Sequence, residues 1–279
     1  MDGRSTWHSG LKSLVGAGFV TFFYASLLLF GGSLSAIAQE SAGQASSTAA
    51  PSARDGSVPF GEYVTLEGWG WLVVSRGESG ERSFGIRSSG GNGHSCGIDG
   101  EIVGTVAKVP TDSAAGVCEV RFFPKQNGSI EVKQAEGAWQ ACGYFCGQRA
   151  GIEGNYLIPA RGCAPSAIWD TRKKFKLAYD SRDYGQAHKL LAPLLTRCAK
   201  TLYWYERYQI INDLAVTLFH LGRKSDCRGV LKPLVELAQT PDDSIEAPPI
   251  EADLLRPFAR AARTNLKLCG YRVKMKDAE

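Results

Sequence analysis

The sequence lacks the motifs that mark most catalytic and cofactor sites. Only four histidines occur in 279 residues, and none belongs to an HExxH pair of metal ligands. A nucleophile elbow, a phosphate-binding loop and a dinucleotide-binding fingerprint are missing as well. We therefore expect no catalytic residue, no metal and no cofactor, and we predict that the chain is not an enzyme.

A strong excess of charge of one sign is also missing. The net charge is only +4. Residues 60–163 hold nine basic and eleven acidic side chains, and residues 164–279 hold twenty basic and fourteen acidic ones. A mild basic excess on helices is more typical of a solvated face than of a nucleic-acid site. We expect no nucleic-acid partner.

The amino terminus has the pattern of an export signal. Arg4 and Lys12 precede an uncharged stretch, residues 13–38, that closes on the small-residue pattern Ala36-Ile37-Ala38. This pattern predicts a signal peptide over residues 1–38, cleaved after Ala38. An uncleaved anchor is the alternative, because about 20 apolar residues span a membrane. We expect a periplasmic or secreted protein, with a membrane as partner only if the segment stays uncleaved.

A polar segment follows the signal. Residues 39–59 begin QESAGQASSTAAPSARDG and are rich in Ser, Ala and Gly without apolar periodicity. Such a composition cannot bury a core. We expect a flexible linker here.

Short strands are predicted over residues 60–163. The stretch EYVTLEGWGWLVV alternates large and small side chains, and four further alternating stretches follow it, separated by turn residues. Asn127-Gly128 is a strong hairpin signal, because both residue types tolerate positive φ. Five or more antiparallel strands in about 100 residues favour a small barrel or sandwich.

Helical periodicity begins after Cys163 and predicts helices up to residue 272. Gly222 is placed to end a helix in the left-handed conformation. Ser225 is a candidate N-cap for the next helix, and Pro257 a favourable first residue for the last one. The fold class expected is α+β, a small antiparallel β domain followed by an α-helical hairpin-repeat domain over residues 164–272.

An internal repeat supports helix pairs. AHKLLAPLL at 187–195 aligns with CRGVLKPLV at 227–235, an offset typical of helix-pair arrays. Pro193 and Pro233 occupy the same phase, and each is expected to kink or restart its helix. The stretch NDLAVTLFHLGRKSDCRGVL resembles a tetratricopeptide unit, with Cys227 at the usual alanine position. That resemblance covers residues 167–240 and implies packed antiparallel helices.

All eight cysteines lie after the signal, and an even number in an exported chain predicts disulfides. In an antiparallel helix array, the start of one helix lies beside the end of its partner. Cys163 and Cys198 then share one end of the array, and Cys227 and Cys269 the other. Since a bridge needs Cα atoms about 4.4–6.8 Å apart, we predict the pairs Cys163–Cys198 and Cys227–Cys269.

Four cysteines remain in the strand domain, Cys96, Cys118, Cys142 and Cys146, and three pairings are open. We favour Cys142–Cys146 with Cys96–Cys118, because a four-residue offset at a turn can close locally. The set lacks the C-x₂-C spacing of zinc and redox centres. These cysteines are therefore expected to fasten the domain.

The segment CGYFCGQRAGIEGNY at 142–156, with Cys118 before it and Cys163 after it, resembles the closing part of cysteine-stapled β domains of bacterial envelope proteins, some of them lysozyme-inhibitor-like. The resemblance covers residues 60–163. It implies a compact periplasmic module that binds a wall-degrading hydrolase. The inhibitory loop motif of the better-known inhibitor families is missing, so no inhibitory residue is transferred.

Aromatic residues crowd the start of one predicted helix, in LYWYERY at 202–208. They surround the helix, so they are not expected to face one core, and Tyr and Trp are favoured in interfaces. Tyr203, Trp204, Tyr205 and Tyr208 are therefore the partner-binding candidates. We expect a non-enzymatic exported protein that binds a protein partner, such as a lysozyme-like hydrolase. The alternative is a periplasmic scaffold whose helical repeats hold a protein complex.

Overall fold

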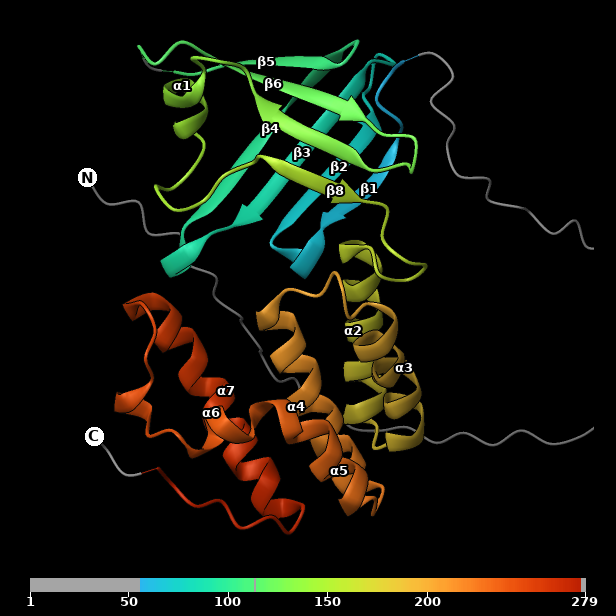
Figure 1. The fold of residues 1–279 in the computed structure, drawn as a ribbon. Helices are drawn as coiled ribbons and strands as arrows, with labels where there is room; N and C mark the ends of the chain where they lie inside the picture. The colour runs from blue at the N-terminus through green and yellow to red at the C-terminus, as the bar shows by residue number, and fades with distance from the viewer. Residues whose placement is uncertain (1–55, 113, 277–279) are drawn as a thin grey trace, which may run out of the picture. The chain divides into compact units, whose positions relative to one another are not determined.

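The computed structural model describes residues 56–112 and 114–276. The predicted signal peptide and nearly all of the predicted linker lie outside these residues. The described chain is α+β, with a β-barrel followed by a six-helix domain of packed helix pairs (Figure 1). The expected fold class is thus confirmed. Contacts place all described residues in one compact unit.

Eight antiparallel strands form a closed barrel in chain order, and β8 returns to pair with β1. Each strand therefore has a neighbour on both sides. The strands are β1 (Gly61–Thr65), β2 (Gly70–Arg76), β3 (Arg82–Ser89), β4 (Ser95–Val103), β5 (Val106–Pro110), β6 (Val117–Pro124), β7 (Ile130–Gln134) and β8 (Gly154–Leu157). A short helix, α1 (Trp139–Gly143), lies between β7 and β8.

The first predicted strand is two strands. A 3₁₀ turn, η1 (Leu66–Gly68), separates β1 from β2, and Glu67 has a φ of 64° there. Apolar alternation continues on both sides of the turn, so the sequence pattern does not reveal the break. The Asn127-Gly128 hairpin prediction is confirmed: it joins β6 to β7, Gly128 has a φ of 81°, and Asn127 Oδ1 accepts from the Ser129 N–H at 3.1 Å.

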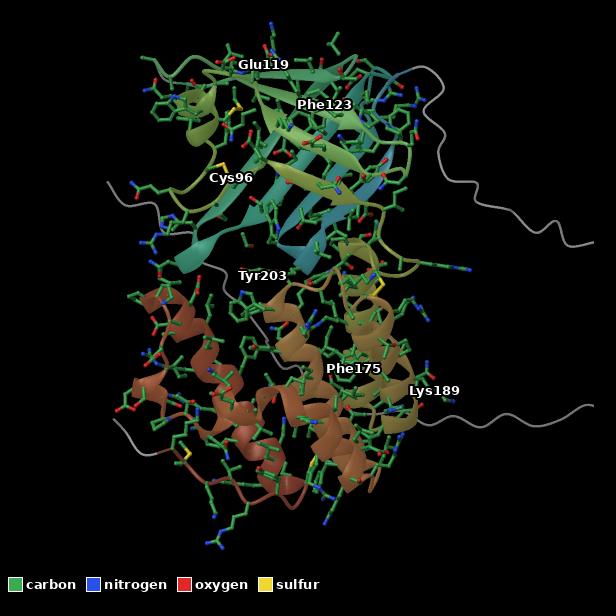
Figure 2. The ribbon with its side chains drawn as sticks, in the orientation of Figure 1. Cys96, Glu119, Phe123, Phe175, Lys189 and Tyr203 are labelled. Carbon is green, nitrogen blue, oxygen red and sulfur yellow. A yellow bond between two sulfur atoms is a disulfide. The ribbon has the colours of Figure 1, made fainter. Side chains whose placement is uncertain are left out.

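The six helices pack mainly in neighbouring pairs, and Phe175 lies in their shared core (Figure 2). They are α2 (Pro165–Asp180), α3 (Tyr184–Arg197), α4 (Trp204–His220), α5 (Lys224–Leu231), α6 (Val235–Gln239) and α7 (Pro249–Leu268). Gly222 follows α4 with a φ of 74°, as predicted. Pro233 lies in a 3₁₀ turn that separates α5 from α6, whereas α3 continues through Pro193.

Two helix starts were predicted wrongly. The last helix begins at Pro249, and Pro257 lies inside it. Ala252, before Pro257, is buried like Phe258 and Ala259 after it, so packing on both sides stabilises one continuous helix. Ser225 was predicted to cap a helix that begins at Asp226, but α5 begins two residues earlier, at Lys224, and its N-cap residue, Arg223, makes no side-chain capping bond.

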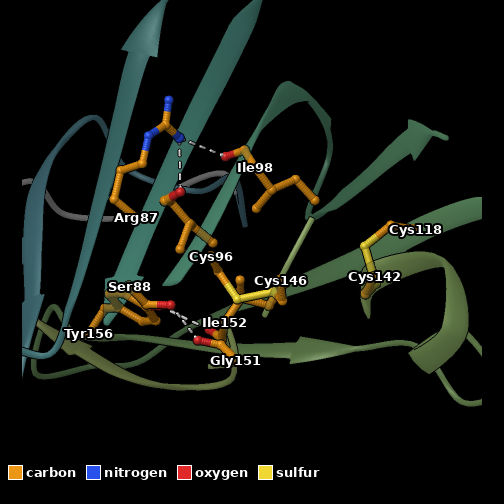
Figure 3. Close-up of a disulfide and its surroundings, with 11 residues drawn as sticks. Arg87, Ser88, Cys96, Ile98, Cys118, Cys142, Cys146, Gly151, Ile152 and Tyr156 are labelled. Carbon is orange, nitrogen blue, oxygen red and sulfur yellow. Dashed lines mark hydrogen bonds between the residues drawn. A yellow bond between two sulfur atoms is a disulfide. The ribbon is translucent and has the colours of Figure 1, made fainter. Parts of the chain in front are cut away.

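Four disulfides fasten the chain. Cys163–Cys198 and Cys227–Cys269 join helix ends with Cα separations of 5.3 and 6.0 Å, which confirms the predicted pairs. The barrel pairing was predicted wrongly, since the bonds are Cys96–Cys146 and Cys118–Cys142 (Figure 3).

The reason for the different barrel pairing lies in the backbone. The segment carrying Cys146 forms an antiparallel bridge with Cys96, the residue it bonds. Cys142 is buried on α1, and α1 packs on β6, the strand of Cys118. Cys146 therefore lies beside Cys96 and Cys142 beside Cys118, although Cys142 and Cys146 are only four residues apart in the sequence.

Candidate binding site at the junction of barrel and helices

The barrel interior is filled with side chains. Large residues from most strands are almost completely buried inside it, among them Tyr63, Leu72, Ile86, Ile98, Phe122, Ile130 and Tyr156. Burial also raises the pKa of the Tyr156 hydroxyl, which donates to the Ile152 carbonyl at 2.9 Å. A ligand must therefore bind on the outside of the barrel.

One contact between barrel and helices is made by η1. The Glu67 N–H donates to the Lys200 carbonyl at 2.7 Å, in the loop before α4. Gly68 packs directly on this loop, because a Cβ there would overlap the backbone of Thr201 and Tyr203 and lie 2.9 Å from the carbonyl carbon of Leu202. The two backbones are therefore in direct contact, and only glycine fits at position 68.

A second contact is made by the turn η2 (Gly91–Gly93), between β3 and β4. Asn92 donates through its N–H to Glu251 Oε1 at 2.6 Å, and its Oδ1 accepts from the Ile250 N–H at 2.9 Å. Ile250 and Glu251 lie in the first turn of α7. Asn92 thus satisfies a helix N–H that has no partner within the helix.

Both contacts carry unusual backbone conformations. Among the described residues, Glu67, Asn92 and Arg182 are the non-glycine residues with positive φ. Two of the three lie at the junction, with φ of 64° and 55°. Such conformations cost about 1–3 kcal/mol and persist where the surroundings impose them. The junction is therefore held in one arrangement by specific contacts.

Three neighbouring cavities of about 470, 400 and 290 Å³ lie along this junction. Tyr203, labelled in Figure 2, lines all three cavities, and Trp69 lines two of them. We call them together the junction crevice. Its barrel side includes Ser88, Ser89 and Ser95, and its helical side includes Trp204 and Tyr205.

The predicted aromatic cluster forms the helical wall of the crevice. The rings of Trp204, Tyr205 and Tyr208 lie 6.3, 4.9 and 6.0 Å from the ring of Phe258, all nearly perpendicular to it. Tyr203 lies 5.6 Å from Trp204. The four candidates are each half-buried. They pack against one another and still present part of their surface to the crevice.

Phe258 is a central residue that the sequence did not point to. It is 7% exposed and lies on α7, far along the chain from the cluster it supports. The sequence shows only one more apolar residue of an amphipathic helix. To find Phe258 from the sequence, one would have had to know that α7 packs against α4.

A desolvated carboxylate lies at the same helix start. Glu206 lines the largest of the three cavities, and burial raises the pKa of its carboxyl, opposed by Arg172 and by the Tyr203 backbone N–H. Arg172 itself donates to Gln209 at 2.6 Å and to Asp213 at 3.3 Å. Burial raises the pKa of Asp213 as well, against the effect of Arg172.

The crevice offers recognition groups: aromatic faces, hydroxyls and a few charges. Such lining is typical of a site that fixes a ligand by packing and a small number of hydrogen bonds. Within residues 56–112 and 114–276 no group of His, Cys, Asp and Glu could hold a metal ion, and every described cysteine is in a disulfide.

The fold and site define a class: a disulfide-stapled eight-strand barrel joined to a six-helix domain. Four disulfides indicate an oxidising environment outside the cytoplasm. No family model, curated protein or solved structure matches the chain. Of the helices in the described part, none has the length and apolar character needed to cross a bilayer.

Proposed function

We propose that this chain is an exported binding protein without catalytic activity, and that its junction crevice receives a segment of a protein partner. One observation carries the proposal: a crevice lined by half-buried Trp and Tyr side chains on a rigidly fixed junction. Aromatic residues dominate binding energy when they fill or line pockets at the centre of an interface.

The rigidity of the crevice favours tight binding. A site that is already ordered loses little side-chain entropy when a partner binds. Trp204, Tyr205 and Tyr208 are ordered by Phe258, and the barrel side is ordered by the contacts of Glu67 and Asn92. The barrel is closed and the crevice is lined by aromatic, hydroxyl and charged side chains, so recognition there uses side chains rather than an added strand.

The partner class we propose is a cell-wall hydrolase such as lysozyme. The support is the resemblance of residues 142–156 to stapled envelope domains of the lysozyme-inhibitor-like kind. In the structure this segment carries Cys142 and Cys146 and is bonded twice to the barrel. A rigid module of this kind restrains an enzyme by occluding it.

A lysis assay with purified lysozyme tests the proposal. The oxidised full chain is titrated into lysozyme with bacterial cells as substrate, and complex formation is measured by calorimetry. Tyr203→Ala should weaken both effects, because Tyr203 lines every part of the crevice. Trp139→Ala is the control, because Trp139 is 69% exposed on α1 and does not line the crevice. Absence of protection and of a complex at excess protein refutes the hydrolase partner.

A scaffold in which the helical repeats hold a protein complex is the second candidate. It is favoured by the outer face of α2, where Trp169 and Leu177 are 63% and 69% exposed. Lys173 lies between them on the same face, with its Nζ 5.0 Å from the Trp169 ring. If this face holds the complex, Trp169→Ala with Leu177→Ala should release a co-purified partner, whereas Tyr203→Ala should not.

A further inference from the structure

A second concave surface lies on the outer wall of the barrel. It measures about 550 Å³, and we call it the wall groove. It crosses strands β2, β3 and β4 and shares Trp71 and Arg87 with the junction crevice. Its other side-chain-bearing lining residues are Val73, Ser75, Glu81, Ser83, Phe84, Asp99 and Glu101.

Glycines shape the groove. Strand register places Gly85 between Val73 and Asp99, and places Arg87 beside Trp71. The charged side chains lie over glycines: a Cβ on Gly85, in the groove, would lie 2.7 Å from Asp99 Oδ1, and one on Gly97, in the adjoining crevice, would lie 3.6 Å from Arg87 Cδ. The groove is therefore hollowed at Gly85, which has no side chain, with Trp71 and Val73 on one side and the charged side chains of Arg87 and Asp99 on the other, which we call the charged wall.

The charged wall is an exposed ion pair. Arg87 Nη2 donates to Asp99 Oδ2 at 2.8 Å, and Arg87 Nη1 donates to the Ile86 carbonyl at 2.9 Å. The side chains of Arg87 and Asp99 are 53% and 63% exposed. An exposed pair is worth little to stability, so its donors and acceptors can turn to a ligand at small cost.

Polar hydroxyl and carboxylate groups continue the wall. Ser75 Oγ and Ser83 Oγ lie 3.2 Å apart in the row next to Val73 and Gly85, and Glu101 pairs with Ser83 across the strands. Arginine only donates, carboxylates only accept, and a hydroxyl does both. A hydroxyl of a ligand can therefore accept from Arg87 while it donates to Asp99.

We infer that the wall groove binds an oligosaccharide: an uncharged, hydroxyl-rich chain whose sugar rings lie on Trp71 and Val73 and whose hydroxyls pair with Arg87 and Asp99. A sugar ring has an apolar C–H face, suited to an indole, and a rim of hydroxyls, suited to this wall. A sugar chain thus matches both the aromatic surface of the groove and its charged wall.

The same lining disfavours other ligands. Three carboxylates and one guanidinium line the groove, so a phosphate-bearing chain would be repelled. A lipid chain would cover the carboxylates and the guanidinium of the groove without offering them hydrogen-bond partners, which costs free energy. β2 and β3 are paired on both sides, so a peptide could add as a strand only at the edge of β4, where β5 pairs with Ile102 and Val103 alone, and the hexapeptide probe below tests that edge.

The groove is long enough for several sugars. β3 contributes Ser83, Gly85 and Arg87 to the groove and Ser89 to the crevice beyond. Residues 83 to 87 span about 13 Å of strand, at about 3.3 Å per residue, and the crevice continues this line. An extended chain is therefore favoured over a single sugar.

The test uses the oxidised full chain and three probes: the β-1,4-linked tetramers of N-acetylglucosamine and of glucose, and an uncharged hexapeptide of alternating Ala and Ser. Binding is measured by calorimetry and by the NMR shift of the Trp71 indole N–H. We expect one tetramer to bind and Arg87→Ala and Asp99→Ala to weaken it about tenfold, or about 1.4 kcal/mol. Arg121→Ala is the matched control, because Arg121 forms an exposed pair with Glu119 at 2.8 Å, outside the groove, and is 51% exposed. It should leave binding unchanged.

Three results would overturn the inference: no saturable binding of either tetramer at about 1 mM, equal binding by all variants, or binding of the hexapeptide in preference. The proposed protein partner is tested separately. Asp99 lines only the wall groove, so Asp99→Ala should leave lysozyme binding through the crevice unchanged.

Discussion

The junction can be tested by adding one methyl group, with Gly68→Ala. The new Cβ would overlap the backbone of Thr201 and Tyr203, and Gly68 has a φ of 70°. An L-residue in this conformation costs about 1–2 kcal/mol. Forcing the two backbones apart also breaks the hydrogen bond from Glu67 to Lys200, worth about 1 kcal/mol. We expect a total loss of about 2–3 kcal/mol in the free energy of unfolding.

A matched variant separates the two terms. Gly104 has a φ of 64°, but a Cβ there would meet no atom within 4 Å. Gly104→Ala therefore causes only the loss of about 1–2 kcal/mol that comes from an L-residue at positive φ, and it leaves the hydrogen bond from Glu67 to Lys200 intact. Both variants lower the entropy of the unfolded chain equally, so this contribution cancels in the comparison.

The assay is urea unfolding of wild type and both variants, followed by circular dichroism, with hydrogen exchange of the Glu67 amide. We expect Gly68→Ala to be less stable than Gly104→Ala by about 1 kcal/mol or more, and to lose protection of Glu67. If both variants are equally stable and Glu67 stays protected in both, the backbone contact does not hold the junction.

Three further predictions concern single features of the fold. Burial raises the pKa of Glu206 above its ordinary 4.5, so the folded protein is less stable at a pH where this carboxyl is charged. Glu206→Gln should therefore raise the free energy of unfolding at pH 7. In urea unfolding repeated towards pH 4, this gain should vanish, because the carboxyl of the wild type becomes protonated. In a urea titration, Asn92→Ala should lower the free energy of unfolding by about 2 kcal/mol and Asn92→Gly by about 1 kcal/mol. Both variants lose the hydrogen bond from the Ile250 N–H, but glycine adopts the positive φ without strain. Equal losses would contradict this reasoning. Replacing Cys118 and Cys142 together by serine should cost about 3 kcal/mol, for a sequence separation of 24; a thermal shift within error would refute it.

The helical disulfides could be predicted from the sequence, whereas the barrel disulfides could not. Helix periodicity fixes which ends of neighbouring helices meet, and that was enough to pair Cys163 with Cys198. In the barrel, the pairing depends on which strand each segment reaches. The bridge between Cys96 and Cys146 is a contact across 50 residues, and no local pattern marks it.

The antiparallel β domain was predictable, because alternation along a strand is a local property, but the sequence left open whether the strands form a barrel or a sandwich. The break at Leu66–Gly68 was not, because Glu67 takes its conformation where the loop before α4 contacts it. The start of α7 was misjudged for a related reason. Proline at a helix start is a local preference, but the burial of Ala252 and Phe258 on both sides of Pro257 is a tertiary effect.

The aromatic candidates were found because four large rings within seven residues are visible in the sequence. Their arrangement was not visible. Phe258 and the anchoring turns at Glu67 and Asn92 come from distant parts of the chain, and only the fold brings them to the crevice. The wall groove could not be predicted from the sequence either, because its lining residues come from three strands whose register is not visible in the sequence.

The disulfide connectivity also decides how the chain would respond to mechanical load. Three bonds close consecutive loops, 96–146, 163–198 and 227–269. Tension applied between the ends passes through the sulfur bonds and bypasses the residues inside each loop. Stretching then lengthens only the unlooped segments, by about 3.3–3.6 Å per residue. The turns η1 and η2, helix α4 and strands β1, β2, β3 and β8 belong to those segments, so pulling on the protein would distort the crevice while β5, β6, β7 and α7 stay unloaded.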